Sequence, residues 1–153
     1  MIDLGAPREL SSPDEIGALL ASTRTVAVLG MRSEAHADRP AFYVPKYAHD
    51  AGFRVLPVPV HELDASAILG QPVARSVAAI GERVDLVDVF RKPSDLAGHL
   101  DDLRAARPRA VWLQAGIRDD AFARALVDAG IFVVQDRCLL VELRSPGLRA
   151  PGA

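Results

Sequence analysis

Short, nearly continuous apolar runs alternate along this chain with longer segments in which apolar residues recur at helical spacing. The apolar runs predict strands, and they lie at residues 25–29, 54–58, 86–90, 110–113 and 131–134. Strands that are apolar on both faces are typical of a parallel sheet that helices cover on both sides. The alternation of strands and helices therefore predicts an α/β fold with three layers.

Polar signals set the expected helix boundaries. Ser12, Pro13 and Glu15 form a capping-box pattern, which predicts a helix that carries Ile16, Leu19 and Leu20. We place the start of the next helix near Ala41, because proline is tolerated only near a first turn and Pro45 follows closely. Ser94 is expected to cap a helix over 95–106. Further expectations are a turn at 68–70, a mixed segment at 73–80, a helix at 119–129 and a helical turn at 139–143.

The composition describes one ordinary globular domain. A length of 153 residues is typical of a single domain. Along the chain we expect an N-terminal extension at 1–11, the domain at 12–145 and a flexible tail at 146–153. The net charge of −2 argues against a sequence-independent nucleic-acid partner. One cysteine allows no intrachain disulfide, and no apolar run or leader pattern predicts membrane contact or export. We therefore expect a cytoplasmic protein, and base rates alone favour a homodimer.

The strongest chemical signal is the glycine that ends the first strand. Gly30 is followed by Met31, Arg32 and Ser33 and then by a predicted helix. A glycine lets a ligand approach the backbone, and a helix N-terminus offers N–H groups and positive potential, so this pattern is typical of a phosphate site. A purely structural turn is the alternative.

A dinucleotide fingerprint is poorly supported. It needs three glycines and an acidic residue at the end of the second strand, whereas only Gly30 is present here. Glu62, the nearest acid, lies beyond the expected place.

Other unusual residues follow the predicted strands, whose carboxyl ends hold the ligand in open parallel sheets. Basic side chains suit phosphate, although each of them could equally be a solvated surface charge; they are Arg32, Arg39, Lys46, Arg91 and Lys92. Trp112 is either a core residue or part of the wall of a ligand crevice, in which Gln114 and Gly116 contact the ligand. Cys138 is either an inert buried thiol or a nucleophile. We expect Asp136 and Arg137 to form an ion pair, and the histidines show no metal-ligand spacing.

Several spaced motifs together resemble one family, the small stand-alone CoA-binding proteins, which are similar to the CoA-binding domain of the succinyl-CoA synthetase alpha subunit. The resemblance covers about residues 12–145 and rests on Val-Ala-Val-Leu-Gly30, Arg39-Pro40, Gly52-Phe53-Arg54-Val55, Pro57-Val58, Ile68-Leu69-Gly70, Val87-Asp88-Val89-Phe90-Arg91, Ala110-Val111-Trp112-Leu113-Gln114, Gly116-Ile117 and Asp136-Arg137-Cys138.

The resemblance implies a Rossmann-like, doubly wound sheet that binds CoA or an acyl-CoA without catalysis of its own. Carried over by position, the phosphate region would be Gly30, Met31, Arg32 and Ser33. The adenine and ribose side would be Pro57, Val58 and Pro59. Val89, Phe90 and Arg91 would flank the nucleotide or the pantetheine arm, with Gln114, Gly116 and Ile117 opposite. Arg39 and Lys92 complete the expected basic set.

One departure from the family pattern keeps other functions open. Family members carry Val-Asn-Pro after the second strand, where this chain has Val58-Pro59-Val60-His61. The alternatives are an NAD(P)-dependent oxidoreductase, an acyl-CoA enzyme that uses Cys138, and a scaffold whose ligand site has decayed.

Overall fold

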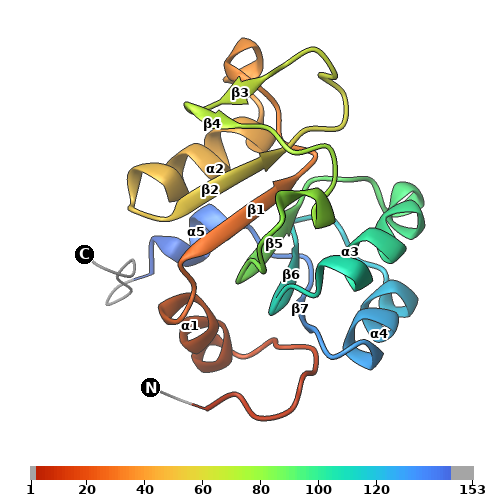
Figure 1. The fold of residues 1–153 in the computed structure, drawn as a ribbon. Helices are drawn as coiled ribbons and strands as arrows, with labels where there is room; N and C mark the ends of the chain where they lie inside the picture. The colour runs from red at the N-terminus through yellow and green to blue at the C-terminus, as the bar shows by residue number, and fades with distance from the viewer. Residues whose placement is uncertain (1–2, 146–153) are drawn as a thin grey trace.

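A computed structural model describes residues 3–145, and a five-stranded parallel sheet forms the centre of the molecule (Figure 1). Its strands run in the order β2 (Arg54–Val58), β1 (Thr25–Leu29), β5 (Leu86–Val89), β6 (Ala110–Leu113) and β7 (Phe132–Val134). All four neighbouring pairs are parallel. The predicted Rossmann-like, doubly wound sheet is therefore confirmed.

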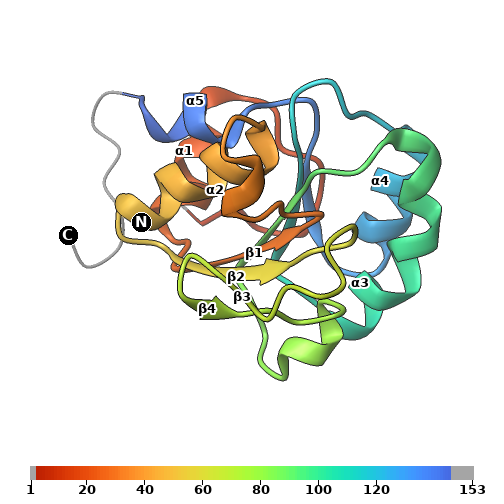
Figure 2. The same ribbon diagram turned by 90° about the horizontal axis from the view of Figure 1, so that it is seen from above.

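Helices cover both faces of the sheet, which completes the three layers (Figure 2). One face carries α1 (Pro13–Ala21), α2 (Pro40–Asp50) and α5 (Leu139–Leu143), and the other carries α3 (Leu100–Ala106) and α4 (Asp120–Asp128). Successive strand residues point to opposite faces, so Val26 and Val28 join the first core whereas Ala27 and Leu29 join the second. The strands are largely apolar because both of their faces are buried, and Asp88 in β5 is the acidic residue that is fully buried among them.

The capping box is present as predicted, but α2 differs from expectation at its proline. The Ser12 Oγ accepts a hydrogen bond from the Glu15 N–H at 3.2 Å. Helix α2 begins at Pro40 and keeps Pro45 inside. Proline donates no hydrogen bond to the carbonyl four residues earlier, and the Arg32 N–H bonds that Ala41 carbonyl instead, at 3.1 Å. The proline thus frees an acceptor that holds the loop after β1.

The helix predicted over 95–106 with Ser94 as its cap is partly wrong. A 3₁₀-helix, Pro93–His99, precedes α3, and its N-cap is Lys92, which makes no capping side-chain bond. Pro93 takes the first helical position, which suits proline, so Ser94 falls inside the segment. Gly98 lies in the same segment, and glycine weakens an α-helix.

Shorter elements complete the chain between these helices and strands. The predicted turn at 68–70 joins a small hairpin, β3 (Ala67–Ile68) and β4 (Gln71–Pro72), and 3₁₀ turns occupy Glu34–His36 and Ala78–Ile80. The expected N-terminal extension touches the sheet, because the Leu10 N–H donates to the Val133 carbonyl at 2.8 Å. The predicted tail at 146–153 lies outside the described residues.

Gly30 is fixed by its surroundings, and replacing it tests how strongly the fold depends on it. Its φ is +86°, and a Cβ there would lie 2.5 Å from the Phe90 carbonyl oxygen. Strain and overlap together predict that Gly30→Ala lowers the free energy of unfolding by about 2–4 kcal/mol in urea denaturation.

Gly17 provides the matched control for this substitution. It lies in α1, and a Cβ there would meet nothing within 4 Å. Gly17→Ala is expected to raise stability by about 0.5–1 kcal/mol. Equal effects at the two glycines would contradict the proposed close approach.

Candidate ligand-binding site

A cavity of about 670 Å³ opens at the carboxyl ends of the central strands. Gly30 follows β1, Phe90 follows β5 and Gln114 follows β6, and all three residues line this cavity. The neighbouring strands β1 and β5 are also the point where the chain changes direction across the sheet. Ligands of open parallel sheets bind at such a switch point, and the volume lies in the usual range for small-molecule sites.

The structure brings most, but not all, of the predicted site residues to this cavity. Those that line it are Gly30, Arg32, Arg39, Phe90, Arg91, Lys92, Gln114, Gly116 and Ile117. Those outside its lining are Met31, Ser33, Pro57, Val58, Pro59 and Val89. Met31 and Val89 are fully buried in the two cores, one on each face of the sheet. The ligand contacts of this second group stay predictions.

Further lining residues did not stand out in the sequence as site residues. Tyr43 comes from α2, His61 from the loop after β2, and Asp95 from the 3₁₀-helix after β5. Cys138, which the sequence left as inert or nucleophilic, lies just before α5 and also lines the cavity. The helix that follows a glycine loop begins at the same edge of the sheet as that loop. Its first turn, which contains Tyr43, could therefore have been expected to line the cavity.

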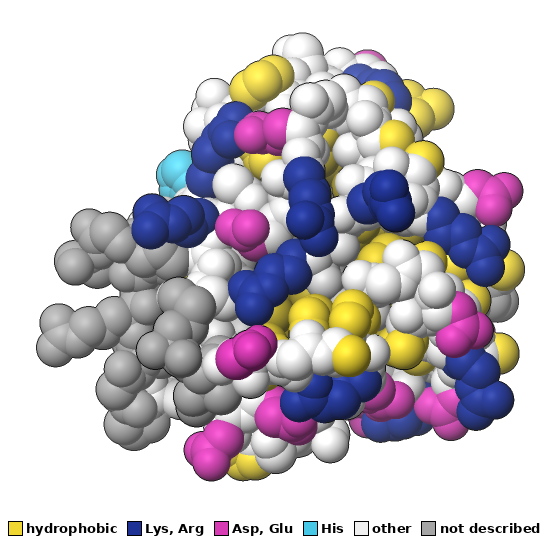
Figure 3. Space-filling model, turned by 60° about the horizontal axis from the view of Figure 1, so that its bottom comes forward, with side chains coloured by type: hydrophobic (Ala, Val, Ile, Leu, Met, Phe, Trp, Pro, Cys, Tyr) yellow, Lys and Arg dark blue, Asp and Glu magenta, His cyan; other side chains and the backbone are white. Residues whose placement is uncertain are grey.

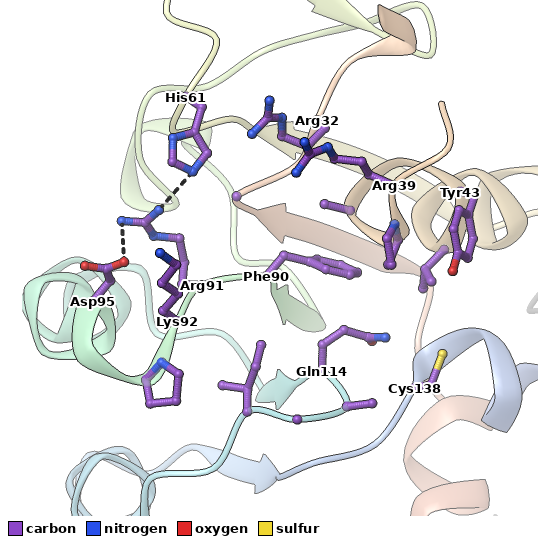
Figure 4. Close-up of a pocket in the computed structure, with 18 residues that line it drawn as sticks. Arg32, Arg39, Tyr43, His61, Phe90, Arg91, Lys92, Asp95, Gln114 and Cys138 are labelled. Carbon is purple, nitrogen blue, oxygen red and sulfur yellow. Dashed lines mark hydrogen bonds and ion pairs between the residues drawn. The ribbon is translucent and has the colours of Figure 1, made fainter. Parts of the chain in front are cut away.

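Two arginines on the cavity rim, Arg91 and Arg32, are held by protein partners, and Figure 4 shows the contacts of Arg91 with His61 and Asp95. The Arg91 Nε donates to the His99 Nε2 at 3.1 Å, and its guanidinium lies 3.5 Å from the Asp95 carboxylate. Its other side lies 3.4 Å from the His61 Nε2. Burial, and then the charge of Arg91, lower the pKa of His99 below its ordinary value. Neutral His99 can therefore accept the hydrogen bond from Arg91.

The other rim arginine, Arg32, is held by the residue next to His61. The Arg32 Nε donates to the Glu62 Oε1 at 3.1 Å, and the Ser33 N–H donates to both Glu62 oxygens at 3.1–3.2 Å. Glu62 is the acid that lies beyond the place where a dinucleotide site needs one. In the fold it bonds to the glycine loop, so its oxygens are already occupied by protein donors.

Two further cations on the rim make no ion pair within residues 3–145, namely Arg39 at the N-cap of α2 and Lys92 after β5. Lys46, which the sequence also offered, pairs with Asp50 at 2.6 Å and lies outside the cavity lining. On the face drawn in Figure 3, acidic and basic side chains are interspersed. Arg39 and Lys92 are therefore the rim cations best placed to meet an anionic ligand.

The opposite end of the cavity is formed by Phe90, Gln114 and Cys138 (Figure 4). Gln114 is 5% exposed, and its Oε1 accepts the Leu139 N–H at 3.0 Å. That bond fixes the orientation of the amide, so that its N–H groups remain available to donate to a ligand in the cavity. The site thus has a charged rim and a less polar end.

The loop beside Gln114 corrects one prediction. Asp136 and Arg137 form no ion pair with each other: the Asp136 Oδ1 accepts the Gly116 N–H at 2.7 Å, and Arg137 pairs with Glu142 at 3.2 Å. Asp136 has a φ of +57°, which turns its side chain toward the loop after β6. Trp112 is fully buried, and its Nε1 donates to the Arg137 carbonyl at 2.7 Å. It therefore belongs to the core.

The described part of the chain holds neither a cluster of metal-ligating side chains nor a helix able to span a membrane. Within residues 3–145, no group of three or more His, Cys, Asp or Glu side chains could hold a metal ion. No helix in the same part of the chain has both the length and the apolar character needed to cross a bilayer.

The fold and the site define an open α/β protein with a cation-rimmed cavity at its switch point. Residues 24–144 match the model of the CoA binding domain family, and the chain belongs to that family. The chain is 28% identical over 130 residues to the uncharacterized protein YneT of Bacillus subtilis (strain 168), covering 85% of this chain and 93% of YneT.

Solved structures give the same fold. A Thermus thermophilus protein described as cell-free ID.343 is 45% identical, with a TM-score of 0.79 over 86% of this chain and 96% of that one. A hypothetical protein from Pyrococcus horikoshii OT3 is 22% identical, with a TM-score of 0.77 over 93% and 96% of the two chains. This last likeness concerns the fold alone.

The contact between Glu62 and the glycine loop predicts a pH-dependent stability. Burial raises the pKa of the Glu62 carboxyl, but hydrogen bonds from Ser33 and Arg32 and the electrostatic effect of His36 outweigh burial, so the pKa lies below its ordinary 4.5. A lowered folded-state pKa means that the stabilisation is present above the unfolded-state value and is lost as pH falls through the folded-state value. Glu62→Gln should therefore lower the unfolding temperature at pH 7, and the difference from wild type should shrink below about pH 4.5.

Thermal unfolding from pH 7 to pH 3 checks this expectation. Asp38→Asn, which removes an exposed acid near the same loop, is the control and should show no such pH-dependent difference. A Glu62→Gln difference that stays constant across the range would show that the carboxylate charge is not what holds the loop.

Proposed function

We propose that this protein binds CoA or an acyl-CoA in the cavity at the carboxyl ends of β1, β5 and β6, and does so without catalysis of its own. The observation that carries the proposal is the pairing of a cation-rimmed cavity of about 670 Å³ with membership of the CoA binding domain family. The two features are needed together, because a cavity lined by arginines can bind many phosphate-bearing ligands and the family alone does not say where on the molecule CoA would bind.

The residues present fit the chemistry of CoA, which joins a phosphorylated nucleotide to a long uncharged arm with two amides and a thiol. Arg39, Arg91 and Lys92 lie on the rim, and arginine and lysine suit phosphate as a planar clamp and a point charge. Phe90 and Gln114 form the less polar end, where an uncharged arm fits. We therefore orient the ligand with its phosphates on the rim and its arm toward Gln114 and Cys138.

A dinucleotide fits less well than CoA. The acid nearest to the expected ribose position, Glu62, is bonded to Arg32 and to the Ser33 N–H. An acyl-CoA enzyme is the remaining alternative, because the Cys138 thiol lines the same cavity.

A panel of ligands in thermal unfolding tests the proposal. Ligand at about 100 times its dissociation constant stabilises by roughly 2.7 kcal/mol, which raises the midpoint of a chain of this size by about 5–10 °C. We expect that shift with CoA and acetyl-CoA, a smaller one with dephospho-CoA, and none with NAD, NADP or ATP. A shift with NAD or NADP alone would favour an oxidoreductase, and no shift at all would favour a decayed site.

Substitution of two rim cations, Arg39 and Lys92, tests the orientation of the ligand. Arg39→Ala and Lys92→Ala should each weaken CoA binding by about tenfold, because each removes a charge-assisted contact with phosphate. The measurement is isothermal titration calorimetry. Lys46→Ala is the matched control, because it removes a nearby cation outside the cavity and should leave the affinity unchanged. Equal weakening in all three variants would mean that overall charge, rather than these positions, attracts the ligand.

A further inference from the structure

Asp88 is a buried acid that the proposed site does not use. It lies in the middle of β5 with no exposed surface. Neither carboxyl oxygen has a hydrogen-bond partner within the described chain. Its partners across the sheet are Val28 and Trp112, and the indole N–H of Trp112 is already given to the Arg137 carbonyl. Buried polar groups are nearly always paired, so an orphaned one needs an explanation.

Asp88 lies on the strand that leads to Phe90, a residue of the cavity lining. Asp88 precedes Phe90 by two residues, so the two side chains share a face of the sheet, with their Cα atoms about 7 Å apart. The Phe90 N–H donates to Leu29 and the Gln114 N–H donates to Val89, which continues the strand pairing to the cavity edge. Gly30, Phe90 and Gln114 therefore form one row above Asp88, and Gly30 adds no side chain to it.

In this row Phe90 is the residue that follows Asp88 on the same face of the sheet and that lines the cavity. It lines the cavity, packs against the core cluster that contains Val28 and Trp112, and is only partly buried (Figure 4). Its ring is therefore the group that would have to move for a ligand in the cavity to reach the Asp88 carboxyl.

We propose that Asp88 is the polar floor of a deeper subsite, which opens when Phe90 moves aside and which binds an amide or thioester carbonyl of the ligand's uncharged arm. This inference rests on the proposed function. The orphaned oxygens, the position two residues before Phe90 on the same face of the sheet and the neighbouring Gln114 amide carry it together.

The chemistry of the carboxyl selects the arm over the phosphates. Burial raises the pKa of Asp88 well above its ordinary value, which favours the neutral acid. A neutral carboxyl offers one donor and one acceptor, the complement of an amide. An ionised one would repel phosphate, and the rim cations Arg39 and Lys92 already provide the phosphate contacts. The subsite therefore suits an amide-bearing arm.

The test compares two ligands and two variants by isothermal titration calorimetry. CoA carries the arm, whereas adenosine 3′,5′-bisphosphate lacks it. Asp88→Leu keeps the branched shape without polar atoms, and it should weaken CoA binding by about tenfold and leave the bisphosphate unchanged. Asp88→Asn keeps a donor and an acceptor, and it should bind CoA within about threefold of wild type. Val87→Ala, on the opposite face of β5, is the control for core disruption and should not discriminate between the ligands.

The outcomes separate this inference from the function on which it rests. Normal CoA binding by Asp88→Leu, or equal weakening of both ligands, would overturn the subsite alone. Failure of the wild-type protein to bind CoA would overturn the proposed function and the subsite with it.

A second measurement covers the case in which Asp88→Leu does not fold. Difference infrared spectroscopy of wild type should show an unpaired carboxyl band that moves to lower frequency when CoA is added and that is absent in Asp88→Asn. An unchanged band with CoA bound would overturn the subsite.

Discussion

The cavity depends on the close approach between Gly30 and the backbone of Phe90. At this point β1 ends against β5, and a Cβ on Gly30 would lie 2.5 Å from the Phe90 carbonyl oxygen. The absence of a side chain lets the two strands stay adjacent up to the edge of the sheet while the loop after β1 turns away with a φ of +86°. The strand order changes direction at the same place: the chain leaves β1 toward β2 and leaves β5 toward β6. These two connections run in opposite directions and leave a hollow between them.

The loop after Gly30 is held from two sides by protein groups. The Arg32 N–H donates to the Ala41 carbonyl, which Pro45 leaves without its usual helical partner. The Ser33 N–H and the Arg32 side chain both bond Glu62. The Arg32 and Ser33 N–H groups, which could bind a phosphate in a simple glycine loop, are already hydrogen-bonded within the protein. Under the proposed function, a ligand phosphate would therefore meet the rim side chains, chiefly Arg39, Arg91 and Lys92.

The parts of the fold that the sequence predicted are those governed by local pattern. Apolar runs located all five strands of the parallel sheet, and the Ser12–Glu15 capping box and the turn at 68–70 followed from nearby residues. Strand ends also located Arg91 and Gln114, because the carboxyl ends of parallel strands meet at one edge. The burial of Met31 was not visible in the sequence, because a loop residue after a glycine can point to solvent or to the core with equal local preference.

The remaining differences come from contacts between residues far apart in the chain. Pro45 remains inside α2 because Arg32 satisfies the acceptor that it frees. Asp136 bonds Gly116, twenty residues away, instead of its neighbour Arg137. Glu62 and His61 reach the two rim arginines only because the loop after β2 crosses the cavity edge. Such pairings depend on the order of the strands in the sheet, which a local sequence pattern does not reveal.

The most direct test of the central claim is a crystal structure of the protein with CoA. We expect density for the ligand between the ends of β1, β5 and β6, with its phosphates against Arg39, Arg91 and Lys92 and its arm toward Gln114. Density for CoA on another face of the molecule, or an empty cavity at a CoA concentration that saturates binding in solution, would contradict it.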